Sequence, residues 1–550
     1  MAAQASNTSR PNLQLPPQFE DSYKDFELYP ANILLKNSYE AALQAQRARL
    51  DDFSPRLFTK SNSIYVPIRE FTGVGNNGGL RRTGNGPNKI IDDNSLKRWL
   101  GDATPSSSYA TVEDPKCRFI FINGDSSRDP LNITRQMLLR ILSYHQVNPA
   151  YLDFLFVFGS QNEARGLRFS GFHEQMTFAR PSRQLPIPSL RRSGRQYQLT
   201  YNLKSVARKM RSNPRGQPIR VPISEMQWSI RQAAIHHQFD VEIGTTLWIV
   251  TQGNLDIFER VVQMTAVHGR KEDRAFADGP ECFRTSLTTH LLYCYWSIEE
   301  WRWYIQWLED VIDTETGNVL YSARGIKEQH EYRPQDIQSV QYHEDRAKEA
   351  IMVLETNTDV LISIRDFYIR LMNPLKIKDF DLATNTTCQE SVNAFATKID
   401  DMISDSRMQI ARAKLLTQIA ADRKNLIIQF LQGQATEKME GLTRITVKIS
   451  QASQREAIAM RIITVVTLLY LPATFVSTFF STDIIKYQNP GGGDESTSDL
   501  NSQYMGSFSQ VAMDRWLQVT VPLTILTILG AGYAFYKIDQ SAKRDIEKLQ

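Results

Sequence analysis

The chain has 550 residues, of which 41% are apolar, with a formal net charge of +4 and a mean hydropathy of −0.37. This length favours about two to four domains, and the average composition is that of a soluble protein, so any membrane segment has to be sought in the distribution of residues. The small net charge gives no argument for a nucleic-acid partner, and four scattered cysteines without a CxxC pair argue against a disulfide scaffold or a structural zinc site.

Residues 1–110 are expected to be largely irregular. Met1–Pro17 is polar and contains three prolines, which predicts neither a secretory signal nor a mitochondrial presequence. Gly73–Gly78 has the spacing of the dinucleotide-binding fingerprint, but Gly84 continues the loop where the motif requires a helix. We therefore interpret this motif as a Gly/Asn-rich loop.

From residue 111 the pattern becomes that of an α/β cytosolic domain. Arg118–Ile122, Leu152–Phe158 and Leu247–Val250 are predicted strands, and Thr134–Tyr144 is a predicted helix. Helices packed on a sheet follow from this alternation. His236-His237 has no cysteine or carboxylate at zinc spacing, so a structural role is expected.

The segment Arg180–Arg220 carries eleven Lys and Arg residues and no Asp or Glu. Two interpretations stay open: contact with anionic lipid headgroups or an acidic subunit face, or an ordinary solvated linker. Nucleic acid is not expected, because Tyr197 and Tyr201 are the only aromatic side chains available for stacking.

The following region is predicted to be helical. Leu291–Asp313 contains four tryptophans and several charges, which favours a packed amphipathic helix. One helix is predicted from Gln335 to Met372, and a second from Cys388 into the membrane. The second helix would be a long helical stalk that transmits cytosolic motion to the membrane. Its acidic residues include Asp400, Asp401, Asp405 and Asp422.

Ile462–Phe480 contains 19 residues without a charge. A membrane span needs roughly 20 apolar residues, so this is the first of two predicted C-terminal transmembrane α-helices; a buried core helix is the alternative. At about 100° per residue, one stripe of the helix collects Met460, Thr464, Thr467, Leu471, Thr474, Thr478 and Ser481. In an oligomer with this stripe inward, the hydroxyls form rings for a hydrated cation and the apolar positions form a constriction. The alternative is that the threonines bond to their own helix and pack against neighbours.

Val519–Tyr536 is the second predicted span. Gly530 and Ala534 have the spacing of close helix packing, which favours an outer helix. Lys and Arg flank both spans on one side, while the connecting loop is net acidic. Both termini are therefore expected to be cytosolic, with an outer loop that attracts cations.

Leu471-Pro-Ala-Thr-Phe-Val476 resembles the LPxTF segment of CorA-type magnesium channels, and the layout of the chain resembles that family as well. Cys117–Ile122 and Phe239–Trp248 are similar to stretches of fungal CorA-like proteins. The family's Gly-Met-Asn triplet aligns with Ser481-Thr482-Asp483, where all three residues differ. The resemblance implies a homopentamer with pore-facing side chains at Met460, Ile463, Leu471 and Thr474.

The resemblance implies a channel for magnesium or a related divalent cation and not an enzyme. It implies no cofactor; the cation is the transported ion and a candidate regulator that holds the stalk closed. In the family, carboxylates between subunits bind magnesium in this role, and the candidate sensors in this chain are Asp400, Asp401, Asp405 and Asp422. The entrance would be Ser481, Thr482 and Asp483, the pore stripe would be the four threonines, and Leu471, Ile463 and Met460 would form the gate. Partners are membrane lipid and copies of the same chain, and the plasma membrane is favoured over the mitochondrial inner membrane. Loss of the triplet leaves a second hypothesis open, a non-conducting membrane-anchored scaffold or signalling protein.

The expected division of the chain is an irregular N-terminal region (1–110), a cytosolic α/β domain (111–330), a helical region with the stalk (331–461), the first span (462–480), the outer loop (481–515), the second span (516–536) and a basic cytosolic tail (537–550).

Overall fold

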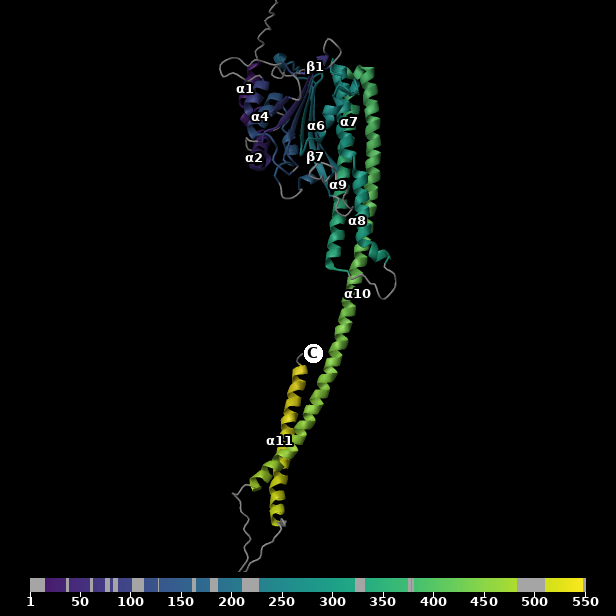
Figure 1. The fold of residues 1–550 in the computed structure, drawn as a ribbon. Coiled ribbons are helices and arrows are strands. Elements are labelled where there is room, and N and C mark those ends of the chain that lie inside the picture. The colour runs from purple at the N-terminus through teal and green to yellow at the C-terminus, as the bar shows by residue number, and fades with distance from the viewer. Residues whose placement is uncertain are drawn as a thin grey trace, which may run out of the picture. The chain divides into compact units, whose positions relative to one another are not determined.

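The structure is a computed structural model that describes residues 15–35, 39–59, 63–74, 80–82, 88–100, 113–126, 128–160, 165–178, 186–209, 227–321, 332–373, 377, 380–481 and 510–547. The chain divides into two compact units, Met1–Phe430 and Leu431–Gln550. Each unit is described by itself (Figure 1).

The first unit is built on a mixed sheet of eight strands. The main path runs β2 (Leu80–Arg82), β1 (Val66–Val74), β4 (Cys117–Asn123), β8 (Thr246–Gln252), β7 (Gln227–Asp240), β6 (Gln196–Lys209) and β5 (Phe172–Thr177), with β3 (Asn88–Ile90) also paired to β1. Only β4 and β8 are parallel neighbours among the described strands. These two strands are buried along their whole length, as expected for parallel strands covered on both faces.

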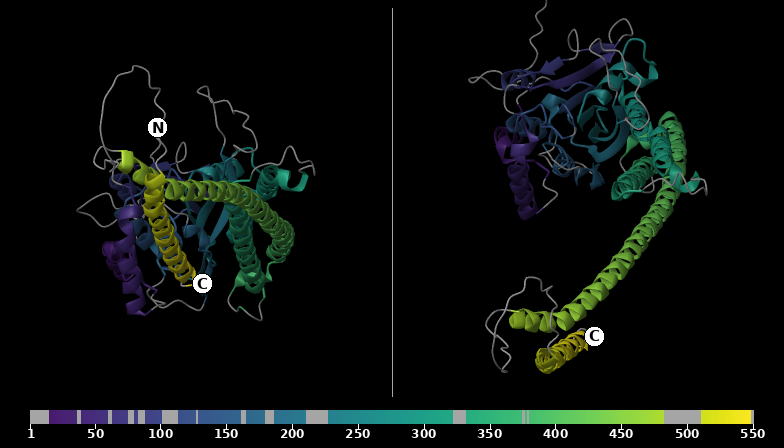
Figure 2. Two further views of the ribbon diagram at one scale, coloured as in Figure 1. Left: turned by 90° about the horizontal axis from the view of Figure 1, so that it is seen from below. Right: turned by 60° about the horizontal axis from the view of Figure 1, so that its bottom comes forward.

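Helices cover both faces of this sheet. One face carries α1 (Pro17–Lys24), α2 (Glu40–Leu57), α3 (Asp93–Leu100), α4 (Arg135–His145) and α5 (Tyr151–Leu155). The other carries α6 (Asp256–Met264), α7 (Gly279–Ile298), α9 (Pro334–Leu371) and the first turns of α10 (Thr386–Ser481), with α8 (Trp301–Tyr321) packed on α9. The views in Figure 2 keep the N-terminal helices and α7–α9 on opposite sides of the sheet. The predicted fold class, an α/β domain followed by a long helix and two apolar C-terminal helices, is confirmed.

Several local predictions need correction. Residues before 110 contain α1, α2, β1 and α3, because Phe19, Leu50 and Ile68 supply wholly buried side chains to the core. The predicted strand Leu152–Phe158 is not formed, and its first residues, Leu152–Leu155, belong to α5. The Asn148 side chain accepts a hydrogen bond from the Ala150 N–H at 2.8 Å just before this helix. A short apolar run that is buried on all sides has no hydrophobic periodicity, so its sequence does not distinguish a strand from a helix.

The predicted helix Leu291–Asp313 is two helices that meet at a corner. The chain turns at Glu299 and Glu300, where Glu300 has a φ of 65°. Arg260 binds the Glu299 carboxylate through two hydrogen bonds of 2.8 and 2.7 Å. The turn brings the Trp301 side chain into full burial. Burial of the Trp301 indole therefore stabilises the corner more than an unbroken helix would stabilise the chain at this point.

The basic stretch at Arg180–Arg220 is only partly a surface feature. Its described central part forms β6 inside the sheet, and Arg192 lies buried against Asp114 at 2.6 Å. Arg191 and Arg195 form ion pairs with Glu113 and Glu242. Strand β6 is buried continuously from Tyr197 to Val206, including Lys204, so its composition does not reveal that it lies inside the sheet. Residues 179–185 and 210–226 lie outside the described residues.

The second unit contains the remainder of α10 and helix α11 (Gln510–Glu547). Both are long and apolar enough to cross a membrane. The predicted spans Ile462–Phe480 and Val519–Tyr536 lie inside these two helices. Figure 1 shows α11 running back alongside the last part of α10. The expected outer loop lies mostly outside the described residues, since 482–509 are not described.

Candidate functional site: the first span and its hydroxyl stripe

One face of the first span packs on α11. Its least exposed side chains recur every four residues, at Leu468, Pro472, Val476 and Phe480, and Val476 is only 4% exposed. Trp516 of α11 donates its indole N–H to the Ser477 hydroxyl at 3.0 Å across this contact. The first span therefore has a defined side that faces the second span.

The hydroxyl stripe lies on the other side of the helix. Every predicted stripe residue is exposed, with Met460 and Leu471 at 67% and 63%. At about 100° per residue, the centre of the stripe and the centre of the α11-facing side are roughly 150° apart. Ile463, 63% exposed, lies at the edge of the stripe. Within one chain, then, the second span does not cover the stripe.

The threonine hydroxyls of the stripe all bond to their own helix. Thr464 donates to the Met460 carbonyl at 2.7 Å, and Thr474 donates to the Tyr470 carbonyl at 3.0 Å. Thr467 and Thr478 make the same bond to Ile463 and Thr474. The alternative interpretation of the stripe had two parts, and this is the first: the threonine hydroxyls bond to carbonyls of their own helix. The second half, packing against neighbours, does not hold within the chain, because these residues are exposed.

The back-bonding also fixes the chemistry of the stripe. A hydroxyl has one donor and two acceptor lone pairs, so a threonine that donates to its own helix offers only acceptors to what lies outside. Water molecules around a metal cation point their hydrogens outward, away from the ion. A line of acceptor oxygens therefore suits the outer face of a hydrated cation.

Pro472 lies on the side that faces α11. Proline has no N–H, so the Leu468 carbonyl one turn earlier loses its helical partner. Thr474 bonds to both the Tyr470 and Leu471 carbonyls, each at 3.0 Å, next to this break. The weakened turn therefore lies beside Leu471, the central apolar residue of the stripe.

The inner side of α11 uses threonines rather than the glycine spacing seen in the sequence. Its less exposed residues are Ala512, Trp516, Thr520, Leu523, Thr524, Thr527 and Ala531. Thr520 is 5% exposed and donates to the Trp516 carbonyl at 2.6 Å. Gly530 and Ala534 are exposed, and a Cβ added at Gly530 would meet open space. The predicted close packing at Gly530 and Ala534 is therefore not made within the chain.

The exposed stripe extends beyond the predicted residues. Met439, Leu442, Ile445 and Ile449 fall on the same side of α10 as Met460 and are between 55% and 68% exposed. Sequence reasoning missed them because threonines and charges interrupt the run. Their spacing of three and four residues was the available signal.

The predicted entrance is only partly described. Ser481 is the exposed last residue of α10, while Thr482 and Asp483 lie outside the described residues. Among the residues that are described, no group of three or more His, Cys, Asp or Glu side chains is arranged to hold a metal ion. Of the candidate sensor carboxylates, Asp400 forms an ion pair with Arg365 of α9.

In the first unit, the early part of α10 is tied to α8 and α9 by ion pairs. Arg412 binds Glu309 through two hydrogen bonds, and Arg423 binds Asp313. Lys424 donates to Glu344 of α9 at 2.6 Å. These pairs hold the early part of α10 against α8 and α9.

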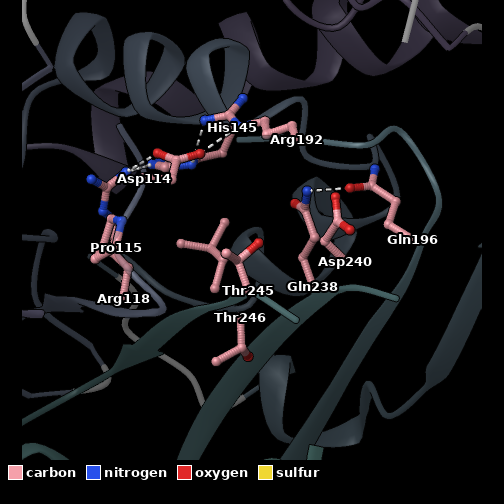
Figure 3. Close-up of a pocket in the computed structure, with 11 residues that line it drawn as sticks. Asp114, Pro115, Arg118, His145, Arg192, Gln196, Gln238, Asp240, Thr245 and Thr246 are labelled. Carbon is pink, nitrogen blue, oxygen red and sulfur yellow. Dashed lines mark hydrogen bonds and ion pairs between the residues drawn. The ribbon is translucent and has the colours of Figure 1, made fainter. Parts of the chain in front are cut away.

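A polar cluster in the first unit lies where β4 and β8 begin and β7 ends (Figure 3). Arg118 donates to Glu70 at 2.7 Å and to Asp114 at 2.9 Å, and Arg192 donates to Asp114 at 2.6 Å. Burial alone would lower the pKa of the Arg118 guanidinium, but Glu70 and Asp114 outweigh burial and raise that pKa. The cavity between these side chains has a volume of about 30 Å³, room for about one water molecule. This cluster is a compensated buried network, with no space for a substrate.

The adjacent histidines are part of the core. His290 bonds to Tyr201 at 2.7 Å and to His237 at 3.1 Å, and His237 bonds to Thr246 at 3.0 Å. Burial lowers the pKa of His290 to about 3, so the ring is neutral near pH 7. Both histidines of the His236-His237 pair are fully buried.

Comparison with known proteins adds a family. Residues 21–320 match the family described as CorA-like, CorA-like transporters. No curated protein matches the chain. Among solved structures, the full-length CmaX protein is similar at 10% identity and a TM-score of 0.29, covering 85% of this chain and 98% of that chain. The cytoplasmic domain of ZntB from Vibrio parahaemolyticus RIMD 2210633 is similar at 8% identity and a TM-score of 0.30, covering 66% and 99%.

Similarity at such TM-scores supports no functional inference. The family match covers 300 residues (21 through 320) of 550. Because it spans more than half of the sequence, and two helices can cross a membrane, the chain is a membrane protein that belongs to the CorA-like family of transporters.

Proposed function

We propose that this protein conducts a divalent metal cation, magnesium or a related ion, through a pore lined by the first span of several copies of the chain. The observation that carries this proposal is the uncovered hydroxyl stripe on the side of α10 opposite α11. A bilayer offers no partner for such acceptors, whereas a water-filled path does. Membership of a transporter family supports the same reading.

The proposed permeant species is a hydrated ion. The described part of each predicted span contains no ionisable side chain except tyrosine, so no carboxylate replaces the water of the ion inside the membrane. Thr464, Thr467, Thr474 and Thr478 accept hydrogen bonds from that water. Leu471, Met460 and Ile463 form the apolar constrictions that close the path by excluding water.

The proposed entrance is the ring of Ser481, Thr482 and Asp483. A ring of carboxylates concentrates cations at the outer mouth by charge, unlike the neutral Gly-Met-Asn ring of the family resemblance. Entry is driven by the membrane potential, worth about 2.3 kcal/mol per charge for each 100 mV. The proposed assembly is a homopentamer in lipid, with both termini cytosolic and the plasma membrane favoured.

The proposed gate control runs through α10. This helix carries the ion-paired residues Arg412 and Arg423 near one end and the stripe near the other. A shift of α8 or α9 therefore reaches the first span through a continuous helix. In the proposed division of labour, residues 111–330 sense conditions and residues 331–461 carry the response, with the intracellular cation stabilising the closed state.

The test is flux into vesicles that contain the purified protein, measured with a magnesium indicator inside and with cobalt or nickel in separate runs. We expect flux that rises with an inside-negative potential and falls when magnesium is preloaded inside. We expect Asp483→Asn to need a higher outside ion concentration for half-maximal flux, because the ring loses its charge. The matched control is Asp494→Asn, which removes a charge from the same loop eleven residues later.

Absence of flux for all three ions, in the native protein and in Asp483→Asn, would contradict the proposal. A second readout uses a strain that lacks magnesium uptake. A conducting protein restores growth on low magnesium, whereas a membrane-anchored scaffold does not.

A further inference from the structure

The first unit contains a large cavity that the proposed pore does not use. Its volume is about 870 Å³, within the range of roughly 300–1,000 Å³ that is typical of small-molecule sites. It lies beyond the carboxyl ends of β4 and β8, since Asp125 to Arg128 follow β4 and Gly253-Asn254 follow β8. This is the edge of a parallel strand pair at which α/β proteins commonly bind ligands.

One wall of the cavity is aromatic. It is formed by Trp228 of β7, Tyr304 and Trp307 of α8, and Tyr342 of α9. The Tyr304 and Trp307 rings are stacked with centroids 5.7 Å apart, and the Trp228 ring lies 5.6 Å from Tyr304. Tyr342, at the mouth of the cavity, is 55% exposed. Four aromatic rings in one wall favour a ligand that contains a planar aromatic ring.

The remaining lining is rich in hydrogen-bond donors and carries a net positive charge. Arg128, Arg231 and Arg346 face Asp125 and Glu349 across it. Arg346 uses one terminal nitrogen on Glu349 at 2.6 Å and lies 5.3 Å over the Tyr342 ring.

We propose that this cavity binds a nucleoside phosphate. The base stacks on the aromatic wall, against the Trp307 ring. The phosphate is held by the guanidinium groups, of which Arg346 is the central one. Arginine is suited to this role because its planar group binds phosphate oxygens in pairs.

The place of the cavity gives such a ligand a route to the rest of the chain. Tyr342 and Arg346 lie one turn or less from Glu344, which binds Lys424 of α10, and Trp307 lies two residues from Glu309, which binds Arg412. An effect of the ligand on flux would rest on the proposed function; binding itself does not.

The test is calorimetric titration of the full-length protein in detergent, in buffer with a chelator so that no divalent cation takes part. The probes are AMP, ATP, adenosine and inorganic pyrophosphate, and tryptophan fluorescence is followed in parallel. We expect AMP or ATP to bind and to quench fluorescence, and adenosine and pyrophosphate each to bind at least about ten-fold more weakly, since each lacks one half of the recognition.

Two pairs of variants locate the site. Trp307→Leu is expected to weaken nucleotide binding about ten-fold or more, while Trp303→Leu, on the exposed side of the same helix, leaves it unchanged. Arg346→Gln is expected to weaken it similarly, with Arg302→Gln as its matched control outside the cavity. Circular dichroism verifies that each variant is folded.

No binding of either nucleotide to the native protein at millimolar concentration would overturn the inference. Equal binding of pyrophosphate and ATP, or equal loss in a variant and its control, would overturn it as well. A protein that binds nucleotide but conducts no ion would leave this inference standing and contradict only the proposed pore.

Discussion

Replacing Thr467 with tryptophan is expected to lower metal-ion flux about ten-fold or more, because the indole of every copy would fill the path at one level of the stripe. Thr467 lies in the middle of the stripe, and its hydroxyl is bonded to the Ile463 carbonyl of its own helix. The substitution removes this bond within its own helix but no packing against α11, since the residue is exposed. The measurement is initial flux into vesicles with equal amounts of incorporated protein.

The matched control is Val466→Trp. Val466 is the preceding residue, is 49% exposed, and by helical spacing lies about 110° from the centre of the stripe. A tryptophan on this side meets lipid or a neighbouring helix, and flux should stay close to that of the native protein. Equal inhibition by both substitutions, or none by Thr467→Trp, would contradict a path along the stripe.

Acidification from about pH 7.5 to about pH 5.5 is expected to destabilise the first unit strongly. Four histidines are buried there, His145, His236, His237 and His290, and burial lowers the pKa of each ring. A base with a lowered pKa in the folded state remains neutral there but takes up a proton in the unfolded chain. Its contribution is therefore complete above about pH 6.5 and is lost progressively below that value.

For His236 and His290 the pKa in the folded protein is about 3, so the loss continues down to that pH. At one unit below the unfolded pKa, each of these two histidines costs about 1.4 kcal/mol, or about 3 kcal/mol together. That is a large part of the stability of an ordinary domain.

The measurement is the midpoint of chemical denaturation followed by the fluorescence of the first unit at several pH values. His290→Gln, which removes one titrating ring, should make the dependence on pH shallower by about one proton. A midpoint that does not change between the two pH values would show that these rings are protonated in the folded protein.

The sequence predicted the elements that have a strong period or a clear boundary. Helix α9 ends at Leu371, just before Asn373-Pro374, and β4 and β8 are continuous apolar runs at the predicted places. The start of α10 was expected at Cys388 and lies at Thr386. Proline and a sharp change in hydrophobicity fix such boundaries locally.

Other elements depend on contacts between distant residues. Strand β1 contains Pro67, Arg69 and Glu70, which oppose a strand assignment; Glu70 is stabilised by Arg118 of the neighbouring β4. The end of α7 at Ile298 depends on Arg260, 39 residues away from Glu299. Local propensity contains no information about such partners.

The candidate site divides in the same way. The period of the threonines was readable from the sequence, but the side of the helix that meets α11 depends on Trp516 and Val476. Whether Asp483 forms the entrance stays a prediction, because it lies outside the described residues. The cavity between α8, α9 and the ends of β4 and β8 joins segments more than 200 residues apart and leaves no local pattern.

The most direct measurement is the water accessibility of single cysteines in the first span. The four native cysteines are all buried in the first unit, so an introduced thiol is the one that a charged methanethiosulfonate reagent reaches. The account predicts that Thr474→Cys is modified from the aqueous phase and that flux then falls, whereas Val476→Cys, on the side facing α11, is not modified. Modification of Val476→Cys with an inert Thr474→Cys, or unchanged flux after modification at 474, would contradict it.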